Sequence, residues 1–228
     1  MLNDNLEQQV QLIYSQWIEQ RKYPNQWNIQ NEWIDITLSQ ICDVISGFPF
    51  QSDTYTNTGK YRLITIKNVQ DSGIDINVDN YINHVPENLP EYCLLKPMDI
   101  LMSLTGNVGR IGLMYSDDCL LNQRVAIIKP KISTKIQINS VLYALFKSPL
   151  FRNTFESMAT GTSQKNLSPI DVCKLSIKYD EVLFQKVNTI IEPLLKQIVA
   201  NQQNNIKLKS LRDWLLPMLM NGQATIKN

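Results

Sequence analysis

A run of glycines between residues 106 and 112 has residue types that could hold a phosphate group. It reads Gly-Asn-Val-Gly-Arg-Ile-Gly. Its second glycine falls one position too late for the dinucleotide-binding fingerprint, and the Lys-Ser/Thr pair of a phosphate-binding loop is absent. Glycines also serve tight hairpins, because they adopt positive φ without steric cost. We therefore expect a hairpin turn that presents Thr105, Asn107 and Arg110 at a surface tip.

A second candidate is the loop sequence Gly-Thr-Ser-Gln-Lys-Asn at residues 161–166. The amides of Gln164 and Asn166 could bond adenine bidentately. Lys165 and the hydroxyl of Thr162 suit phosphate or guanine. A solvated connecting loop has the same composition, so both interpretations stay open.

Groups suited to catalysis or to metal binding are few. His84 is the single histidine, and the four cysteines include no C-x-x-C pair. The neighbouring acids Asp117 and Asp118 lie in a polar turn, where solvation is the simpler interpretation. Neither a Ser/His/Asp set nor the Asn-Pro-Pro-aromatic motif of an amino-methyltransferase is present. We expect a non-catalytic protein with no metal site and no cofactor.

Composition and charge narrow the class of protein. Hydrophobic residues make up 43% and charged residues 19%, as in globular proteins with a real core. No apolar run approaches the ~18 residues of a membrane span, and no secretory signal is recognisable, so we expect a cytoplasmic protein. The net charge of +1, from 22 basic and 21 acidic residues, argues mildly against nucleic-acid binding. Nucleic-acid binding would be compatible with this charge if basic residues gather on one face, or if partner subunits supply the phosphate contacts.

The elements that must position these loops fall into three regions. An amphipathic helix is predicted from residue 2 to about 20, because Leu6, Val10, Ile13 and Trp17 recur at helical spacing. Short β-like runs dominate residues 33 to 180, with strands predicted in 61–69, 76–82, 99–106, 110–115, 119–130 and 174–179.

A helix is predicted over 139–157. Pro149 lies inside it and would kink or break it, and the apolar side consists of Leu142, Leu145, Phe146 and Leu150. Strands with one inserted helical region indicate the α+β class, with a mixed or antiparallel twisted sheet and flanking helices.

The third region, from Val182 to about Met220, is predicted to be one long helix of coiled-coil type. Pro193 would mark a kink or its first turn, and Pro217 with Gly222 would end it. Asparagine within a coiled-coil seam fixes register at a cost in stability. The partner could be the chain's own domain, the N-terminal helix or another subunit. The seam residues are Val187, Ile191, Leu194, Ile198, Asn201, Asn205, Leu208, Leu211 and Leu215.

Several segments, in this order, resemble the target-recognition domain of type I restriction–modification specificity subunits. The resemblance rests on WIDITLSQICDVISGFPFQS, YRLITIKNV, DILMSLTGNVGRIGLM, LNQRVAIIKP and GTSQKNLSPIDVCKLSI. The tail LKSLRDWLLPMLMNGQ is similar to the end of many such subunits, and NLEQQVQLIYSQW to the segment that precedes a second recognition domain. Together they cover nearly the whole chain.

The resemblance implies sequence-specific recognition of double-stranded DNA, with methyltransferase and restriction/translocase subunits as partners. It implies an N-terminal helix (1–24), a DNA target-recognition domain (25–180) and a helical spacer or dimerisation region (181–228). Full-length members carry two recognition domains joined by two long antiparallel helices, whereas this chain has one of each. A homodimer reading two inverted half-sites would restore the pattern.

The residues expected to contact DNA are polar or basic and lie at predicted turns or strand ends of the matched segments. They are Gln51, Lys67, Asn68, Thr105, Asn107, Arg110, Thr162, Gln164, Lys165 and Asn166. Three alternatives remain open: a protein-interaction adaptor, a small enzyme acting on nucleic acid, and a silent or truncated specificity cassette.

Overall fold

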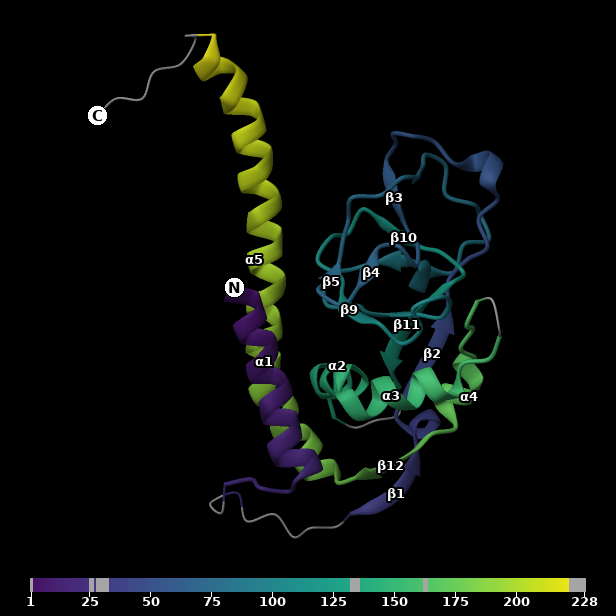
Figure 1. Ribbon diagram of the computed structural model, residues 1–228, viewed down its shortest axis with the longest axis vertical. Helices are drawn as coiled ribbons and strands as arrows, with labels where there is room; N and C mark the ends of the chain where they lie inside the picture. The colour runs from purple at the N-terminus through teal and green to yellow at the C-terminus, as the bar shows by residue number, and fades with distance from the viewer. Residues whose placement is uncertain (1, 25–26, 28–32, 132–135, 162–163, 222–228) are drawn as a thin grey trace, which may run out of the picture.

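The computed structural model describes residues 2–24, 27, 33–131, 136–161 and 164–221. Figure 1 shows a globular part built of strands, with three short helices below it and two long helices running side by side along one flank. The C-terminal half of the longer helix extends past the N-terminus of the other. The N-terminal helix, the strand-rich domain and the long C-terminal helix therefore appear in the predicted order.

The main sheet has the strand order β2-β11-β8-β9, with each neighbouring pair antiparallel. Its strands are β2 (Cys42–Ser46), β11 (Val125–Pro130), β8 (Ile100–Ser103) and β9 (Ile111–Leu113). Because β11 is antiparallel to both β2 and β8, the C-terminal ends of those two strands lie beside the start of β11.

A second sheet has the order β6-β3-β10-β7 and contains one parallel pair, β3 with β10. Its strands are β6 (Tyr81–Ile82), β3 (Tyr61–Ile64), β10 (Cys119–Leu121) and β7 (Leu94–Leu95). Two antiparallel pairs complete the β structure, β4 (Val69–Gln70) with β5 (Gly73–Ile74) and β1 (Ile34–Thr37) with β12 (Ser176–Tyr179). The α+β class and the mixed sheet are confirmed.

The predicted run 119–130 is in fact two strands that belong to different sheets. β10 ends at Leu121, a turn follows, and β11 begins at Val125. The Val125 amide donates to the carbonyl of Asn122 at 2.9 Å, which closes the turn. Asparagine favours such turns, but the apolar residues on either side hid this one.

The helices are α1 (Leu2–Tyr14), extended by the π-helical turn η1 (Ser15–Glu19), α2 (Asn139–Lys147), α3 (Pro149–Met158), α4 (Pro169–Cys173) and α5 (Glu181–Met220). Short 3-10 turns lie at η3 (Leu38–Gln40), η4 (Ser52–Thr54) and η5 (Glu91–Cys93). Among the described helices, none combines the length and the apolar character that a membrane-spanning helix requires.

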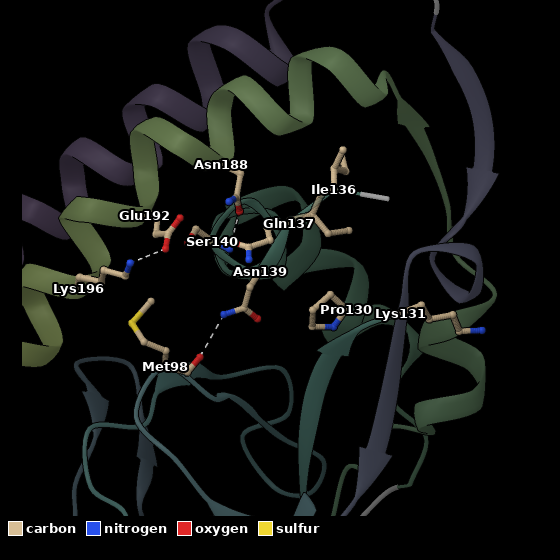
Figure 2. Close-up of a pocket in the computed structure, with 11 residues that line it drawn as sticks. Met98, Pro130, Lys131, Ile136, Gln137, Asn139, Ser140, Asn188, Glu192 and Lys196 are labelled. Atoms are coloured by element: carbon tan, nitrogen blue, oxygen red, sulfur yellow. Dashed lines mark hydrogen bonds and ion pairs between the residues drawn. The ribbon is translucent and has the colours of Figure 1, made fainter. Parts of the chain in front are cut away.

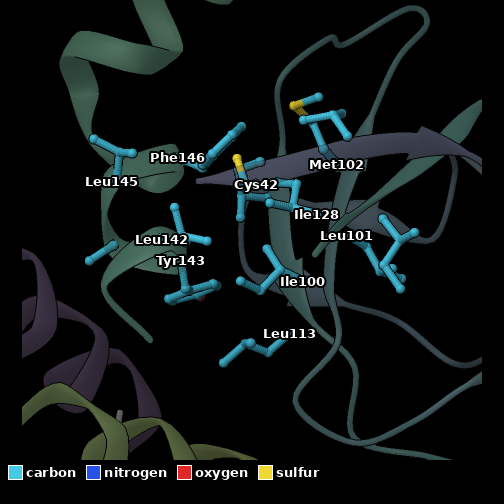
Figure 3. Packing of buried hydrophobic residues seen from close by; sticks show 14 of the residues in the cluster. Cys42, Ile100, Leu101, Met102, Leu113, Ile128, Leu142, Tyr143, Leu145 and Phe146 are labelled. Atoms are coloured by element: carbon cyan, nitrogen blue, oxygen red, sulfur yellow. The ribbon is translucent and has the colours of Figure 1, made fainter. Parts of the chain in front are cut away.

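The core lies between the main sheet and α2. Figure 3 shows Leu142, Tyr143 and Phe146 of α2 facing side chains of the sheet. All three are 1% exposed or less. The sheet side chains around them include Cys42, Ile100, Leu113 and Ile128, all buried. One continuous apolar core therefore joins α2 to the strands that carry the loops discussed below.

The break predicted at Pro149 within the helix over 139–157 is confirmed, because the chain leaves the helical conformation at Ser148 and forms two helices, α2 and α3. That residue is extended (φ −63°, ψ 148°), as expected before a proline, and Pro149 begins α3. The Ser148 side chain accepts from the amide of Phe151 and caps α3. Leu150, expected on the buried side, is 63% exposed, since the break turns α3 to a new direction.

The long C-terminal helix is confirmed as α5, and of the two places predicted for Pro193, a kink or the first turn, the first turn is wrong. Asp180 caps the helix by accepting from the Leu183 amide, so Pro193 lies in the interior and not in the first turn. Pro217 also lies inside α5, which continues to Met220. Gly222 lies outside the described residues.

The seam residues divide into two groups. Val187, Ile191 and Ile198 are buried, and Leu194 packs partly buried on the same core. Beyond Asn201, whose amide donates to Oδ1 of Asn3 at 2.8 Å, the seam leaves the domain. Leu208 and Leu211 are 62% and 49% exposed, Asn205 is exposed and Leu215 is half-buried. The chain's own domain and α1 cover only the first part of the seam.

A hollow of about 510 Å³ lies between α5 and the globular part. Figure 2 shows Asn188 of α5 pointing toward the start of α2. Its Oδ1 accepts from the backbone amides of Ser140 and Val141 at 2.8 and 3.1 Å. Those amides would otherwise be unsatisfied at the helix N-terminus. This buried asparagine, which the seam pattern did not single out, fixes α2 against α5.

Candidate nucleic-acid interface

Several loops meet at one end of the main sheet, where β2 and β8 end and β9 and β11 begin. Ser46 pairs with Ala126, and Ser103 pairs with Val125. The segments that leave these strands are therefore neighbours although they are far apart in the sequence. We call them the loop end: residues 47–51, 65–67, 104–110, 122–124 and 164–166.

The glycine run forms the hairpin turn between β8 and β9, as predicted. Gly106 and Gly109 have φ of 73° and 72°, a region that costs other residues strain. A Cβ on Gly109 would lie 2.9 Å from the Phe155 ring. The Ser103 hydroxyl donates to the Asn107 carbonyl at 2.5 Å and accepts from the Arg110 amide at 3.0 Å. The turn is thus held in one conformation.

The second candidate loop lies directly beside this turn. The Gly106 amide donates to the Lys165 carbonyl at 2.9 Å, and the Leu167 amide donates to the Leu104 carbonyl at 2.8 Å. Thr105 also forms an isolated β-bridge with Asn166. Two segments chosen separately from the sequence therefore form one backbone-bonded surface, on which Asn107, Gln164, Lys165 and Asn166 are exposed.

Arg124 is a further exposed residue of this surface, and it is not among the DNA contacts predicted from the sequence. Its carbonyl accepts from the Leu104 amide at 3.0 Å, and its Nη1 donates to Oε1 of Gln164 at 3.4 Å. The Gln123 amide donates to the Phe48 carbonyl at 3.1 Å, which brings the segment containing exposed Gln51 to the same end. The signal was a basic residue following Asn122, a favoured turn former.

Lys67 and Asn68 have different environments, although they are adjacent. Lys67 is exposed and pairs with Asp79 at 2.9 Å. Asn68 is only 5% exposed. Its Oδ1 accepts from the Thr65 amide, and its Nδ2 donates to the carbonyls of Asp75 and Asn77. Asn68 shapes the loop from inside, so its expected role as a DNA contact does not fit its burial.

Two residues of the glycine turn also differ from expectation. Thr105 is 6% exposed, because the neighbouring loop covers it. The Arg110 side chain is 24% exposed and its Nη2 lies 2.9 Å from Oδ2 of Asp71, so it is held inside the domain. The prediction that these two side chains stand free at a tip is therefore wrong. Thr162 lies outside the described residues.

The cations of the loop end are not all neutralised by the protein. Within the described residues, Arg124 and Lys165 form no salt bridge. Near Lys165, the pKa of the Glu156 carboxyl is lowered, chiefly by a hydrogen bond from Arg152 and by its charge, with a smaller contribution from Lys165. Two exposed cations without a salt bridge thus lie beside the exposed amides of the loop end, which are Gln51, Asn107, Gln123, Gln164 and Asn166.

Other possible chemistry finds little support. In the described part of the chain, no three His, Cys, Asp or Glu side chains come together as a metal site would require. Burial raises the pKa of the Cys42 thiol, and it raises that of Cys119 to about 12. Both thiols are therefore protonated near neutral pH and are poor nucleophiles.

Comparison with known proteins assigns residues 30–210 to the Type I restriction modification DNA specificity domain. The MjaIX specificity subunit of Methanocaldococcus jannaschii is 22% identical over 221 residues, which are 95% of this chain and 48% of that protein. The EcoKI specificity subunit of Escherichia coli is 21% identical over 209 residues, 86% of this chain and 44% of that protein.

Solved structures show the same fold. The S subunit of a type I system from M. genitalium superposes with a TM-score of 0.56 at 18% identity, over 83% of this chain and 46% of that one. The HsdS subunit from Thermoanaerobacter tengcongensis gives 0.53 at 16% identity, over 95% and 51%. The chain thus spans about half the length of the relatives it matches. Since the family model covers most of the chain, the protein belongs to the type I restriction–modification DNA specificity family.

Proposed function

We propose that this chain recognises double-stranded DNA through the loop end, as the specificity component of a type I restriction–modification complex. The observation that carries the proposal is the convergence of the loops. Backbone hydrogen bonds join the glycine turn, the 164–166 loop and the Arg124 turn into one surface of amides and unpaired cations.

The chemistry of that surface suits a duplex. Exposed amides such as those of Gln164 and Asn166 can contact base edges through the groups that their hydrogen bonds within the loop end do not engage, Nε2 of Gln164 and Oδ1 of Asn166. Arg124, Lys165 and Lys67 suit phosphate, which sets the register of the protein on the duplex without reading sequence. Cations gathered at one end also reconcile DNA binding with the net charge of +1.

The test is the salt dependence of duplex binding by the wild type and by the double variant Arg124→Ala/Lys165→Ala. Phosphate contacts give log K a slope of about −0.9 per contact against log salt. We expect the double variant to bind more weakly. Its salt slope should be shallower by about 1.8, the value that corresponds to two lost phosphate contacts. The matched control is Lys178→Ala on β12, an exposed lysine outside the loop end, which should behave as wild type. Absence of salt-dependent binding to any duplex would favour the protein-adaptor alternative instead.

We further propose that the chain works as a homodimer. The support is the distal part of α5, where Leu208, Leu211 and Trp214 are 62%, 49% and 59% exposed in the single chain. An isologous pairing of two copies would cover this face and place two loop ends about a two-fold axis. The DNA site would then be two inverted copies of one half-site. A non-palindromic site would exclude the homodimer.

We also propose that the chain assembles with methyltransferase and restriction/translocase subunits. These are the partners that membership of the family implies. Co-purification with a methyltransferase encoded nearby, followed by mapping of methylated sites, tests this directly. A split methylated motif that depends on this chain supports the proposal. Co-purification without any chain-dependent methylation would favour a silent or truncated cassette.

A further inference from the structure

Arg110 lies inside a network of charges that connects the glycine turn to α3. Its Nη2 is 2.9 Å from Oδ2 of Asp71, and the other oxygen of Asp71 accepts from Nη1 of Arg152 at 3.0 Å. Arg152 also donates to Glu156 at 2.7 Å. One carboxylate, on the β4–β5 turn, therefore holds two arginines from different elements.

This network keeps the Arg110 guanidinium from reaching a ligand. The side chain is 24% exposed, and its buried Nε has no hydrogen-bond partner within the described residues. Charge-assisted bonds to a carboxylate are among the stronger hydrogen bonds in proteins. Moving Arg110 toward DNA would leave Asp71 with only Arg152. An arginine in this setting is better suited to hold a neighbour in place than to contact a base.

The neighbour is Asn107, the exposed residue at the tip of the turn. With its amide in the orientation that satisfies both groups, Oδ1 accepts from Nη1 and Nη2 of Arg110 at 3.2 and 3.3 Å. The backbone of Asn107 is fixed as well, since its carbonyl accepts from the Ser103 hydroxyl. The oxygen of the amide is thus engaged by Arg110, and the NH₂ group is the part left to a ligand.

We infer that Arg110 is a positioning residue that makes Asn107 a hydrogen-bond donor toward DNA; this rests on the proposed function. An asparagine that pairs bidentately with adenine must both donate to N7 and accept from the N6 amino group. With its oxygen committed to Arg110, Asn107 instead matches a base edge made of acceptors. Guanine, with O6 and N7 adjacent in the major groove, is the best such edge. The inference therefore assigns guanine to the position that Asn107 reads.

The experiment is a selection from duplexes of random sequence, using the full chain alone and with its methyltransferase partner. Four variants are compared with wild type: Asn107→Ala, Asn107→Asp, Arg110→Met and Arg152→Met. Asn107→Asp keeps an oxygen for Arg110 and removes the NH₂ donor. We expect it to lose the guanine preference at one position about tenfold or more, as Asn107→Ala does.

Arg110→Met should broaden the preference at that same position while its binding to non-specific duplex keeps the wild-type salt slope. Arg152→Met is the matched control, because it removes the other partner of Asp71 without touching Asn107. It should select the wild-type motif. Thermal unfolding of each variant separates a loss of fold from a change of preference, and Asn107 is exposed, so its two variants are expected to fold.

The outcomes distinguish the inference from the proposal beneath it. If wild type enriches no motif in either condition, DNA recognition itself is refuted, and this inference with it. If wild type enriches a motif but Asn107→Asp retains every preference, the donor role is refuted while DNA recognition stands. If Arg110→Met weakens binding to all duplexes equally and reduces the salt slope, Arg110 is a phosphate contact and not a positioning residue.

Discussion

The two halves of α5 carry the same kind of apolar spacing and have opposite environments. From Leu183 to Val199 the helix packs on α1, on α2 and on the core, and most of its apolar residues are buried. From Asn204 onward most side chains are exposed, including Leu208, Leu211 and Trp214. An apolar stripe thus predicts an apolar contact face on a helix, but it does not say what covers that face. The first half packs on its own domain, whereas the second half is exposed in the single chain.

The largest effect should come from the buried half. Ile191 is fully buried. Ile191→Ala should lower the free energy of unfolding by about 3 kcal/mol, through lost apolar burial and a cavity that the packed surroundings cannot close. Chemical denaturation of the isolated chain measures it. An effect below about 1 kcal/mol would mean that this half of α5 is not part of the cooperative fold.

A somewhat smaller loss is expected for Asn188→Ala, which removes the acceptor of the Ser140 and Val141 amides. Two buried donors would lose their partner, at a cost of about 2 kcal/mol in unfolding free energy. Thr189→Ala, at the next residue but exposed, is the control and should change stability by less than about 0.5 kcal/mol. Equal effects of the two variants would contradict the capping role of Asn188.

The exposed half should respond in the opposite way. Leu208→Glu/Leu211→Glu should change the unfolding free energy of the isolated chain by less than about 0.5 kcal/mol, because the two side chains are 62% and 49% exposed. Its self-association should nevertheless be lost, as measured by sedimentation over a range of concentrations. Leu150→Glu, the same substitution at a leucine of α3 that is 63% exposed, should leave association unchanged. A dimer that survives the double substitution would refute pairing through distal α5.

The smallest effect should lie near the boundary of the two halves, at the ion pair of the exposed Lys196 with the half-buried Glu192. Lys196→Ala should cost about 0.3 kcal/mol, since i,i+4 pairs on a helix surface are weak and salt-screened. Denaturation at low and high salt checks this, and the difference from wild type should vanish at high salt. A loss above about 1 kcal/mol would mean that the pair holds α5 to the domain.

Local patterns in the sequence predicted a large part of the fold. Helical spacing predicted α1 and α5, and glycines at 106 and 109 predicted the hairpin between β8 and β9, because positive φ is a local property. The sequence was less informative around residues 119–130, where an apolar run indicates one strand and Asn122 favours a turn. Apolar residues on both sides of Asn122 hid the turn that separates β10 from β11, and so the exposure of Arg124 remained hidden too.

The candidate site divides in the same way. The sequence identified polar loops, and the structure brings Asn107, Gln164, Lys165 and Asn166 to one surface. The sequence could not distinguish the exposed Lys67 from the buried Asn68. Lys67 faces solvent, whereas the Asn68 side chain hydrogen-bonds to the backbone of its own loop. Burial of a polar side chain depends on partners distant in sequence, as with Arg110 and Asp71.

The sequence by itself determined the residue types, the two long helices, the glycine hairpin and the membership of a family of DNA specificity proteins. Only the tertiary structure decided which loops meet at the end of the main sheet, which amides remain available there, and where α5 leaves its own domain. The physical reason is that turn and helix preferences arise within a few residues. Adjacency and burial instead arise from strand pairing and packing between segments far apart in the chain.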